Sequence, residues 1–106
     1  MYGTVARLRI PANRHEALGE LGRQIESERP PGLVSAYVYQ MDADPNEYYL
    51  AVLFESRAAY LANAESPEQD RRYRQLRKLL AADPEWHDGE VVFETPSHPG
   101  STSADP

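Results

Sequence analysis

Cysteine is absent from this chain of 106 residues. The absence excludes disulfide bonds, thiolate metal sites and cysteine nucleophiles, and it is typical of a reducing compartment. Long hydrophobic runs are missing as well, because Arg7 and Arg9 interrupt the first apolar segment before a signal-peptide core or a membrane span could form. We therefore expect a cytoplasmic protein without a membrane partner.

Basic charge is in deficit: 11 Lys and Arg stand against 17 Asp and Glu, which gives a formal net charge of −6. Such a protein repels phosphate backbones and lacks the counterion release that dominates nucleic-acid affinity, so nucleic acid is not an expected partner. The hydrophobic content of 41% and the seven Tyr are typical of a folded globular protein. The length allows one domain with a modest core.

Alternating and helical patterns predict six main elements. Period-two alternation predicts strands over residues 2–10, 33–41 and 47–55, and a last strand over residues 90–94 that follows an Asp88-Gly89 turn. Helical spacing predicts a helix from an Asn13 N-cap to the prolines at 30 and 31, and another over residues 67–82. A short helical piece follows Ser56. The second long helix has the stronger start signal, since Ser66, Pro67 and Gln69 provide an N-cap, a proline at N1 and a capping-box partner.

The order strand, helix, strand, strand, helix, strand predicts an α+β, ferredoxin-like fold with a four-stranded antiparallel sheet. Right-handed crossovers place both helices on the same face of that sheet. We assign this domain to residues 1–94. Residues 95–106 are Pro, Ser, Gly and small polar residues that cannot bury enough apolar area to offset ordering, which predicts a disordered C-terminal tail.

The strand over residues 47–55 has apolar or aromatic residues on both of its faces, and the strand over 33–41 repeats this pattern. Two helices cover only one face, whereas a solvated face should carry polar side chains. We therefore predict a homodimer in which the uncovered faces pack together through Tyr37, Tyr39, Tyr49 and Leu53. A monomer with a Tyr-rich surface is the alternative.

Several segments together resemble one known family. They are Val52-Leu53-Phe54-Glu55-Ser56-Arg57-Ala58-Ala59-Tyr60, then Asn63 and Ser66-Pro67-Glu68, and finally Pro84-Glu85-Trp86-His87-Asp88-Gly89-Glu90-Val91-Val92. This arrangement resembles the antibiotic biosynthesis monooxygenase domain, which belongs to the dimeric α/β-barrel superfamily. The family contains cofactor-independent, quinone-forming monooxygenases, haem-degrading enzymes and members without an assigned activity.

The haem-degrading branch carries an Asn, a Trp and a His at positions that correspond here to Ala6, Asn63 and Tyr73. None of the three residue types is kept, so the resemblance implies no haem. The three histidines, His15, His87 and His98, have no second His or carboxylate at a ligand spacing, which predicts no metal site. We therefore expect neither cofactor nor metal.

The quinone-forming branch implies a phenolic substrate between the sheet and the helices. By position, Phe54, Asn63 and Tyr73 would bind the substrate, while Tyr60 and Arg74 would act as catalytic donors to the developing anion. Each residue also has a simpler structural interpretation. Tyr60 and Tyr73 fit a core, Asn63 fits a helix end, and the run of Arg71, Arg72, Arg74, Arg77 and Lys78 fits a solvated helix face.

Two functions therefore remain open after the sequence is considered. The first is a cofactor-independent monooxygenase that acts on a small aromatic or phenolic compound. The second is a non-catalytic, dimeric small-molecule-binding or stress-related protein whose pocket is filled by its own side chains. A concave space of about 300 Å³ or more, apolar with a few converging polar groups, would favour the first function. Trp86 is expected to close one end of the core.

Overall fold

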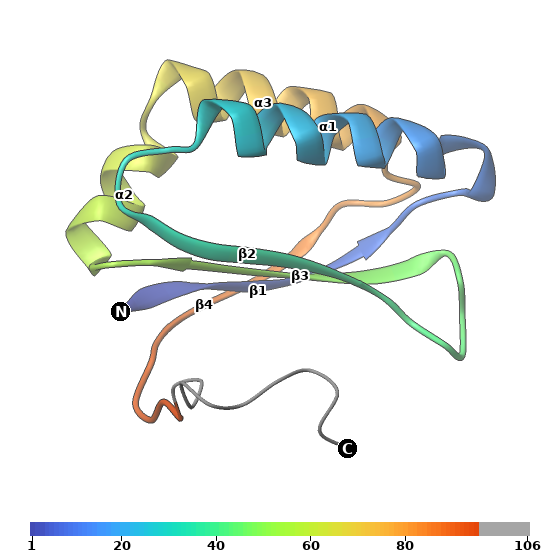
Figure 1. The fold of residues 1–106 in the computed structure, drawn as a ribbon. Helices are drawn as coiled ribbons and strands as arrows, with labels where there is room; N and C mark the ends of the chain where they lie inside the picture. Colours follow the sequence, from blue (N-terminus) through green and yellow to red (C-terminus); the bar gives the residue numbers. More distant parts are fainter. Residues whose placement is uncertain (96–106) are drawn as a thin grey trace, which may run out of the picture.

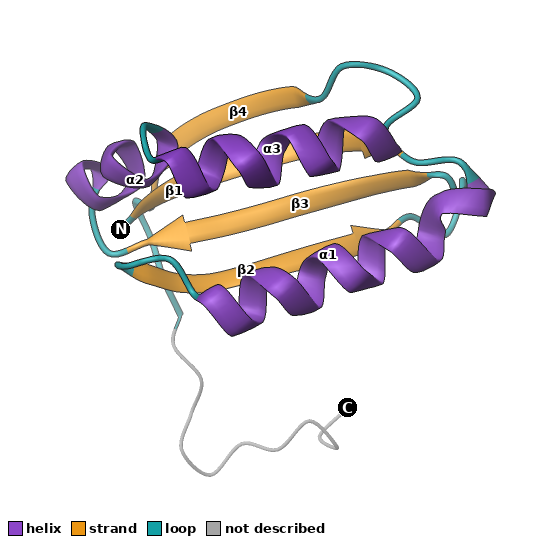
Figure 2. Ribbon diagram, turned by 90° about the horizontal axis from the view of Figure 1, so that it is seen from above, coloured by secondary structure: helices purple, strands orange, loops and turns teal. Residues whose placement is uncertain are grey.

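The computed structural model describes residues 1–95. One antiparallel sheet has the strand order β2-β3-β1-β4, and its helices all lie on one face, as Figure 1 shows from the side and Figure 2 from above. This arrangement confirms the predicted ferredoxin-like fold. The elements are β1 (Tyr2–Arg9), α1 (His15–Glu28), β2 (Leu33–Gln40), β3 (Glu47–Phe54), α2 (Arg57–Ala64), α3 (Pro67–Leu79) and β4 (Glu85–Glu90).

The two central strands, β1 and β3, hold the centre of the core. Ala6 and Leu8 of β1 are buried beneath the helices and lie opposite Leu50 and Tyr48 of β3. Their neighbours in the chain point to the other face, where Val5 is 48% exposed. The period of two in β1 thus directs one set of side chains to the helices and leaves the other set on a face that no helix covers.

The start of α3 follows the predicted capping chemistry, and α2 starts in the same way. The Ser56 hydroxyl accepts a hydrogen bond from the Ala59 amide at 3.1 Å, and the Ser66 hydroxyl accepts one from the Gln69 amide at 3.1 Å. Each cap satisfies an amide that has no partner within the helix. The helix α3 ends at Leu79, three residues before the predicted end, because Leu80 adopts extended backbone geometry.

The predicted N-cap at Asn13 is wrong. Asn13 lies in a 3₁₀ turn, Ala12–Arg14, that precedes α1, and its side chain makes no capping hydrogen bond. The turn closes through the backbone, since the Arg14 amide donates to the Pro11 carbonyl at 2.9 Å. The helix α1 therefore begins only at His15.

The position of the last strand also differs from the prediction. The strand β4 spans Glu85–Glu90, and Gly89 pairs with Gly3 inside the sheet instead of forming a turn. All six β4 residues are exposed, so this edge strand is held by backbone pairing and carries no hydrophobic alternation. The apolar residues that suggested a strand, Val92 and Phe93, are 94% and 82% exposed.

The sheet face opposite the helices carries the side chains on which the predicted homodimer depends. Tyr37 and Tyr39 of β2 are 59% and 55% exposed there, and their rings lie 6.4 Å apart. The predicted tail, residues 95–106, lies outside the described residues except for Thr95. None of the helices in the described part of the chain is both long enough and apolar enough to cross a membrane.

Candidate active site between the sheet and the helices

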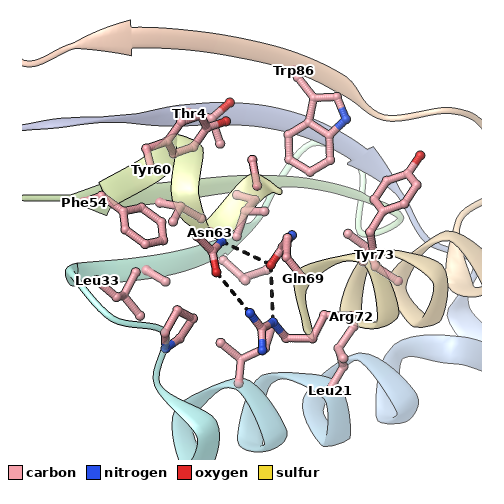
Figure 3. Close-up of a pocket in the computed structure, with 18 of the residues that line it drawn as sticks. Thr4, Leu21, Leu33, Phe54, Tyr60, Asn63, Gln69, Arg72, Tyr73 and Trp86 are labelled. Carbon is pink, nitrogen blue, oxygen red and sulfur yellow. Dashed lines mark hydrogen bonds between the residues drawn. The ribbon is translucent and has the colours of Figure 1, made fainter. Parts of the chain in front are cut away.

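A cavity of about 510 Å³ lies between the sheet and the helices (Figure 3). Its apolar lining comes from β3, through Leu50, Val52 and Phe54, and from α1, through Leu21 and Ile25. The alternation of β3 explains the first group, because residues 50, 52 and 54 lie on the side of the sheet that faces the helices. The polar residues of the lining fall into two groups at different ends of this cavity.

The first polar group is organised by Arg72 of α3, which is only 5% exposed. Its guanidinium donates to Glu28 Oε1 at 2.8 Å, to Asn63 Oδ1 at 3.2 Å and to Gln69 Oε1 at 3.3 Å. A buried guanidinium requires such partners, because burial removes it from water. Figure 3 shows Asn63 and Gln69 converging on it from α2 and from the start of α3.

The contacts of Arg72 orient both side-chain amides. The guanidinium has no acceptor, so it contacts the oxygen atoms of Asn63 and Gln69 and leaves their NH₂ groups to face elsewhere. One of these groups, Asn63 Nδ2, donates to Gln69 Oε1 at 3.3 Å. Gln69 Nε2 donates no hydrogen bond within residues 1–95. This end of the cavity therefore offers hydrogen-bond donors to a ligand.

Glu28, near the end of α1, balances the charge of the arginines. Hydrogen bonds from Arg71 and Arg72, in that order of effect, hold the pKa of its carboxyl below its usual range. Arg71 reaches Glu28 Oε2 at 3.1 Å from the exposed side of α3. The charged pair connects the end of α1 to the first turns of α3, and it keeps Arg72 in place beside the cavity.

The second polar group surrounds Tyr60 of α2. The ring of Tyr60 packs edge-on against Tyr2 at 5.2 Å and Phe54 at 5.7 Å between ring centroids. Its hydroxyl donates to Asp88 Oδ1 at 2.9 Å. Burial, followed by this hydrogen bond and the charge of Asp88, raises the pKa of Tyr60 to about 12, against a smaller opposing effect of the nearby Thr4 hydroxyl. Tyr60 is therefore a neutral hydrogen-bond donor at physiological pH.

Thr4 lies beside this pair, on β1. It is 6% exposed, it lines the cavity, and it is paired with Asp88 in the register of β1 and β4. Its Oγ1 atom is buried and has no hydrogen-bond partner among residues 1–95. Most buried hydroxyl groups have a partner, so this one requires an explanation.

An aromatic pair forms one wall of the cavity. The rings of Tyr73 on α3 and Trp86 on β4 lie 6.3 Å apart with an interplanar angle of 49°. Trp86 is 41% exposed, so it does not close the core as predicted. Tyr60 and Tyr73 lie on different walls and leave space between them (Figure 3).

Four of the five predicted site residues line the cavity, namely Phe54, Tyr60, Asn63 and Tyr73. Arg74 does not. Its side chain is exposed and forms an ion pair with Asp70, one turn earlier on α3. The structure thus brings together the predicted substrate-binding residues and places one of the two predicted catalytic donors on the solvent side of the helix.

The sequence interpretation missed Arg72, whose assignment to a solvated face is wrong. The signal was present in the spacing. Gln69, Arg72, Tyr73 and Leu76 follow each other at the intervals of one helical stripe, and all four line the cavity. Two polar members of an otherwise apolar stripe indicate a buried polar cluster. Thr4 and Asp88 gave no comparable signal, because their proximity depends on the pairing of β1 with β4.

The fold and the cavity define a class, the small ferredoxin-like α+β domains that enclose a pocket between sheet and helices. The sequence profile of the antibiotic biosynthesis monooxygenase family matches residues 1–75. The chain therefore belongs to this family, and the resemblance noted in the sequence is confirmed. No curated protein matches the sequence.

Solved structures share the same fold. SnoaB, a cofactor-independent oxygenase from Streptomyces nogalater, superposes with a TM-score of 0.76 and 16% identity, over 91% of this chain and 97% of its own. A putative antibiotic biosynthesis monooxygenase from Nitrosomonas europaea superposes with a TM-score of 0.71 and 20% identity. The match covers 88% of this chain and 100% of that protein. A putative antibiotic biosynthesis monooxygenase from Chloroflexus aurantiacus superposes with a TM-score of 0.71 and 24% identity. The match covers 90% of this chain and 96% of that protein. At these identities the comparison establishes the fold.

Proposed function

We propose that this protein is a cofactor-independent monooxygenase that binds a small aromatic or phenolic compound in the cavity between the sheet and the helices. The observation that carries the proposal is the cavity itself, which measures about 510 Å³ and combines an apolar lining with two small polar groups. These are the properties of a small-molecule site. Membership of the family and the likeness to a cofactor-independent oxygenase support the same function.

The reaction that fits this site is the conversion of a phenol to a quinone. A phenol and O₂ give a quinone and water: one oxygen atom enters the ring, the other leaves as water, and the substrate supplies all the electrons. Because the substrate itself reduces oxygen, the protein has to exclude water, orient the ring and stabilise negative charge as it develops. The apolar lining serves the first two tasks.

Charge stabilisation falls to the donors at the Arg72 end of the cavity. The guanidinium holds the amides of Asn63 and Gln69 so that their NH₂ groups are available to an oxygen atom of the substrate. Donors that are fixed before the reaction need no reorganisation when charge develops. Arg72 thus takes the cationic role that the sequence had suggested for Arg74, and it acts by positioning the two amides.

We also propose a homodimer, formed through the sheet face that carries Tyr37, Tyr39, Tyr49 and Leu53. The register places these residues on the face opposite the helices, and an uncovered apolar face of this kind is typical of an interface. The cavity lies on the other side of the sheet.

A non-catalytic small-molecule-binding protein is the second candidate. The observation that favours it is the apolar lining of Leu50, Val52 and Phe54, since an anion gains nothing from these side chains. An aromatic ligand that binds in the cavity without consumption of oxygen would support this second candidate. The two functions share the cavity and differ only in whether oxygen is consumed.

The deciding experiment is oxygen consumption with a panel of hydroxylated naphthalenes, using the wild-type protein and two variants. Asn63→Asp keeps an oxygen for Arg72 but replaces the donor NH₂ group by an anionic oxygen, and we expect the rate to fall about tenfold or more. Arg74→Ala is the matched control on the exposed side of α3, and we expect an unchanged rate. A panel member that binds without oxygen uptake would support the second candidate, and a rate loss confined to Arg74→Ala would move the catalytic group to the outer side of α3.

A further inference from the structure

The two ends of the cavity differ in hydrogen-bonding chemistry. At the Arg72 end, amide NH₂ groups are held as donors. At the other end, the charged group is the carboxylate of Asp88, which accepts hydrogen bonds and cannot donate them when ionised. A ligand that spans the cavity therefore meets donors at one end and an acceptor at the other.

Asp88 has acceptor capacity to spare. A carboxylate offers about four acceptor positions, and the Tyr60 hydroxyl occupies one of them on Oδ1. No other side chain of residues 1–95 donates to Asp88, and none of their cations pairs with it. Asp88 also lies on the exposed edge strand β4 and lines the cavity. Its remaining positions are thus available to a group that enters from solvent.

Thr4 provides an independent observation at the same place. Residues paired across two antiparallel strands have Cβ atoms about 4.5–5.5 Å apart, which brings the side chains of Thr4 and Asp88 together on the cavity side of the sheet. The Tyr60 hydroxyl donates to Asp88, and Thr4 Oγ1 lies beside that hydroxyl without a hydrogen bond of good geometry in the described chain. A buried hydroxyl and a free carboxylate oxygen therefore face the same small volume.

We propose that Thr4 and Asp88 form a subsite for a neutral hydroxyl group of the ligand. The ligand O–H donates to the Asp88 carboxylate, and the Thr4 hydroxyl donates to the ligand oxygen, so that both free groups are satisfied by one ligand atom. An ether or a carbonyl has no proton for Asp88, and a phenolate is repelled by it. The inference rests on the proposed aromatic ligand and specifies which end of that ligand carries a protonated hydroxyl.

The test compares two probes whose oxygen carries either this proton or a methyl group in its place, 1-naphthol and 1-methoxynaphthalene, by calorimetric titration of the full chain. We expect the wild-type protein to bind 1-naphthol about tenfold more tightly, which is the effect of one hydrogen bond to a charged group. Asp88→Asn should remove most of this preference, because the proton of 1-naphthol loses its charged acceptor. Thr4→Val should weaken the binding of both probes, because the oxygen atom of either probe can accept from the Thr4 hydroxyl. Thr4→Ser keeps the hydroxyl and should retain the affinity for both probes.

The possible results separate this inference from the proposed function. Equal binding of both probes would leave the aromatic cavity intact and overturn the hydroxyl subsite, as would a preference that Asp88→Asn leaves unchanged or affinities that Thr4→Val leaves unchanged. Binding of neither probe would count against the proposed aromatic ligand and the subsite together. Thr4→Val should melt no lower than the wild-type protein, since its hydroxyl has no described partner to lose.

The pH dependence gives a second readout. The affinity for 1-naphthol should fall as the pH rises through the pKa of the probe, because the naphtholate lacks the proton and meets the charge of Asp88. The affinity for 1-methoxynaphthalene should stay constant over the same range. A naphtholate that binds more tightly than the neutral probe would overturn the inference.

Discussion

Tyr60 shows at the scale of a single residue how this site controls a proton. Its ring is packed between Tyr2 and Phe54, and its hydroxyl is bound to a carboxylate. Both the burial and the neighbouring negative charge penalise the tyrosinate, so the folded protein holds this proton more firmly than the unfolded chain does. Tyr60 therefore serves the cavity as a fixed neutral group and cannot act as a base at physiological pH.

We predict that Tyr60 ionises well above the ordinary pH range of a tyrosine side chain. In a spectrophotometric titration of the wild-type protein, one component should ionise near pH 12, where the pKa of Tyr60 lies, instead of near the ordinary value of 10.0. Tyr60→Phe should lack this component. Because the folded-state pKa is raised, its contribution to stability is complete below pH 10 and is lost as the pH rises towards 12. A component near 10 that disappears in Tyr60→Phe would contradict the prediction.

At the scale of elements, the helices α1 and α3 are joined across the cavity by Glu28, Arg71 and Arg72. Glu28 lies in the last turn of α1, where a negative charge is opposed by the helix dipole. The positive charges of Arg71 and Arg72 offset the unfavourable interaction between Glu28 and the helix dipole. The ion pair thereby fixes the side chain that orients the amides of Asn63 and Gln69, so that helix packing and site geometry depend on the same contacts.

Replacement of Glu28 should lower stability in a pH-dependent way. At pH 7 we expect Glu28→Gln to reduce the melting temperature by a few degrees, since Arg72 loses its charged partner. The pKa of Glu28 is lowered, so its stabilising contribution is present above the ordinary value of 4.5 and is lost as the pH falls through the lower, folded-state pKa. The difference between the two proteins should therefore shrink in acid.

The control is Glu26→Gln on the same helix, whose side chain is exposed and forms no ion pair with residues 1–95. This variant should melt close to the wild-type protein at every pH. Equal melting temperatures of Glu28→Gln and Glu26→Gln at pH 7 would show that the ion pair of Glu28 makes no measurable contribution to stability. Many exposed ion pairs make none.

At the scale of the whole molecule, the sheet separates two surfaces of different character. One face is covered by helices and encloses the cavity, whereas the opposite face exposes Val5, Tyr37 and Tyr39. Large side chains exposed together on a flat sheet are typical of an interface, and a twofold axis would let each chain cover the other. The proposed dimer would thus use the face that the site does not need.

We predict a mass of two chains in light scattering at tens of micromolar. Tyr37→Asp combined with Tyr39→Asp should shift the protein to the mass of one chain, because two charges cannot be buried in an apolar interface. Both positions are more than half exposed within one chain, so we expect the variant to fold. Gln75→Glu on the exposed side of α3 is the control and should remain dimeric. If the wild-type protein has the mass of one chain under these conditions, the proposed dimer is wrong.

Much of the fold could be predicted because its signals are local. The alternation of β1 and β3 and the serine caps at 56 and 66 depend on residues within a few positions of one another. The ferredoxin-like order then follows from these elements and from the handedness of their connections. The resemblance to the family placed Phe54, Asn63 and Tyr73 at the site, and all three line the cavity.

The rest was decided by tertiary structure, because it depends on contacts between distant parts of the chain. The Tyr60 and Asp88 side chains are 28 positions apart, and those of Glu28 and Arg72 are 44 apart. The burial of Arg72 and the register of β4 follow from such pairings. The sequence by itself determined the order of the elements, the positions of most of them and the apolar lining, through local propensity and periodicity. Only the packing of the elements brought the donors and the acceptor of the site to opposite ends of one cavity.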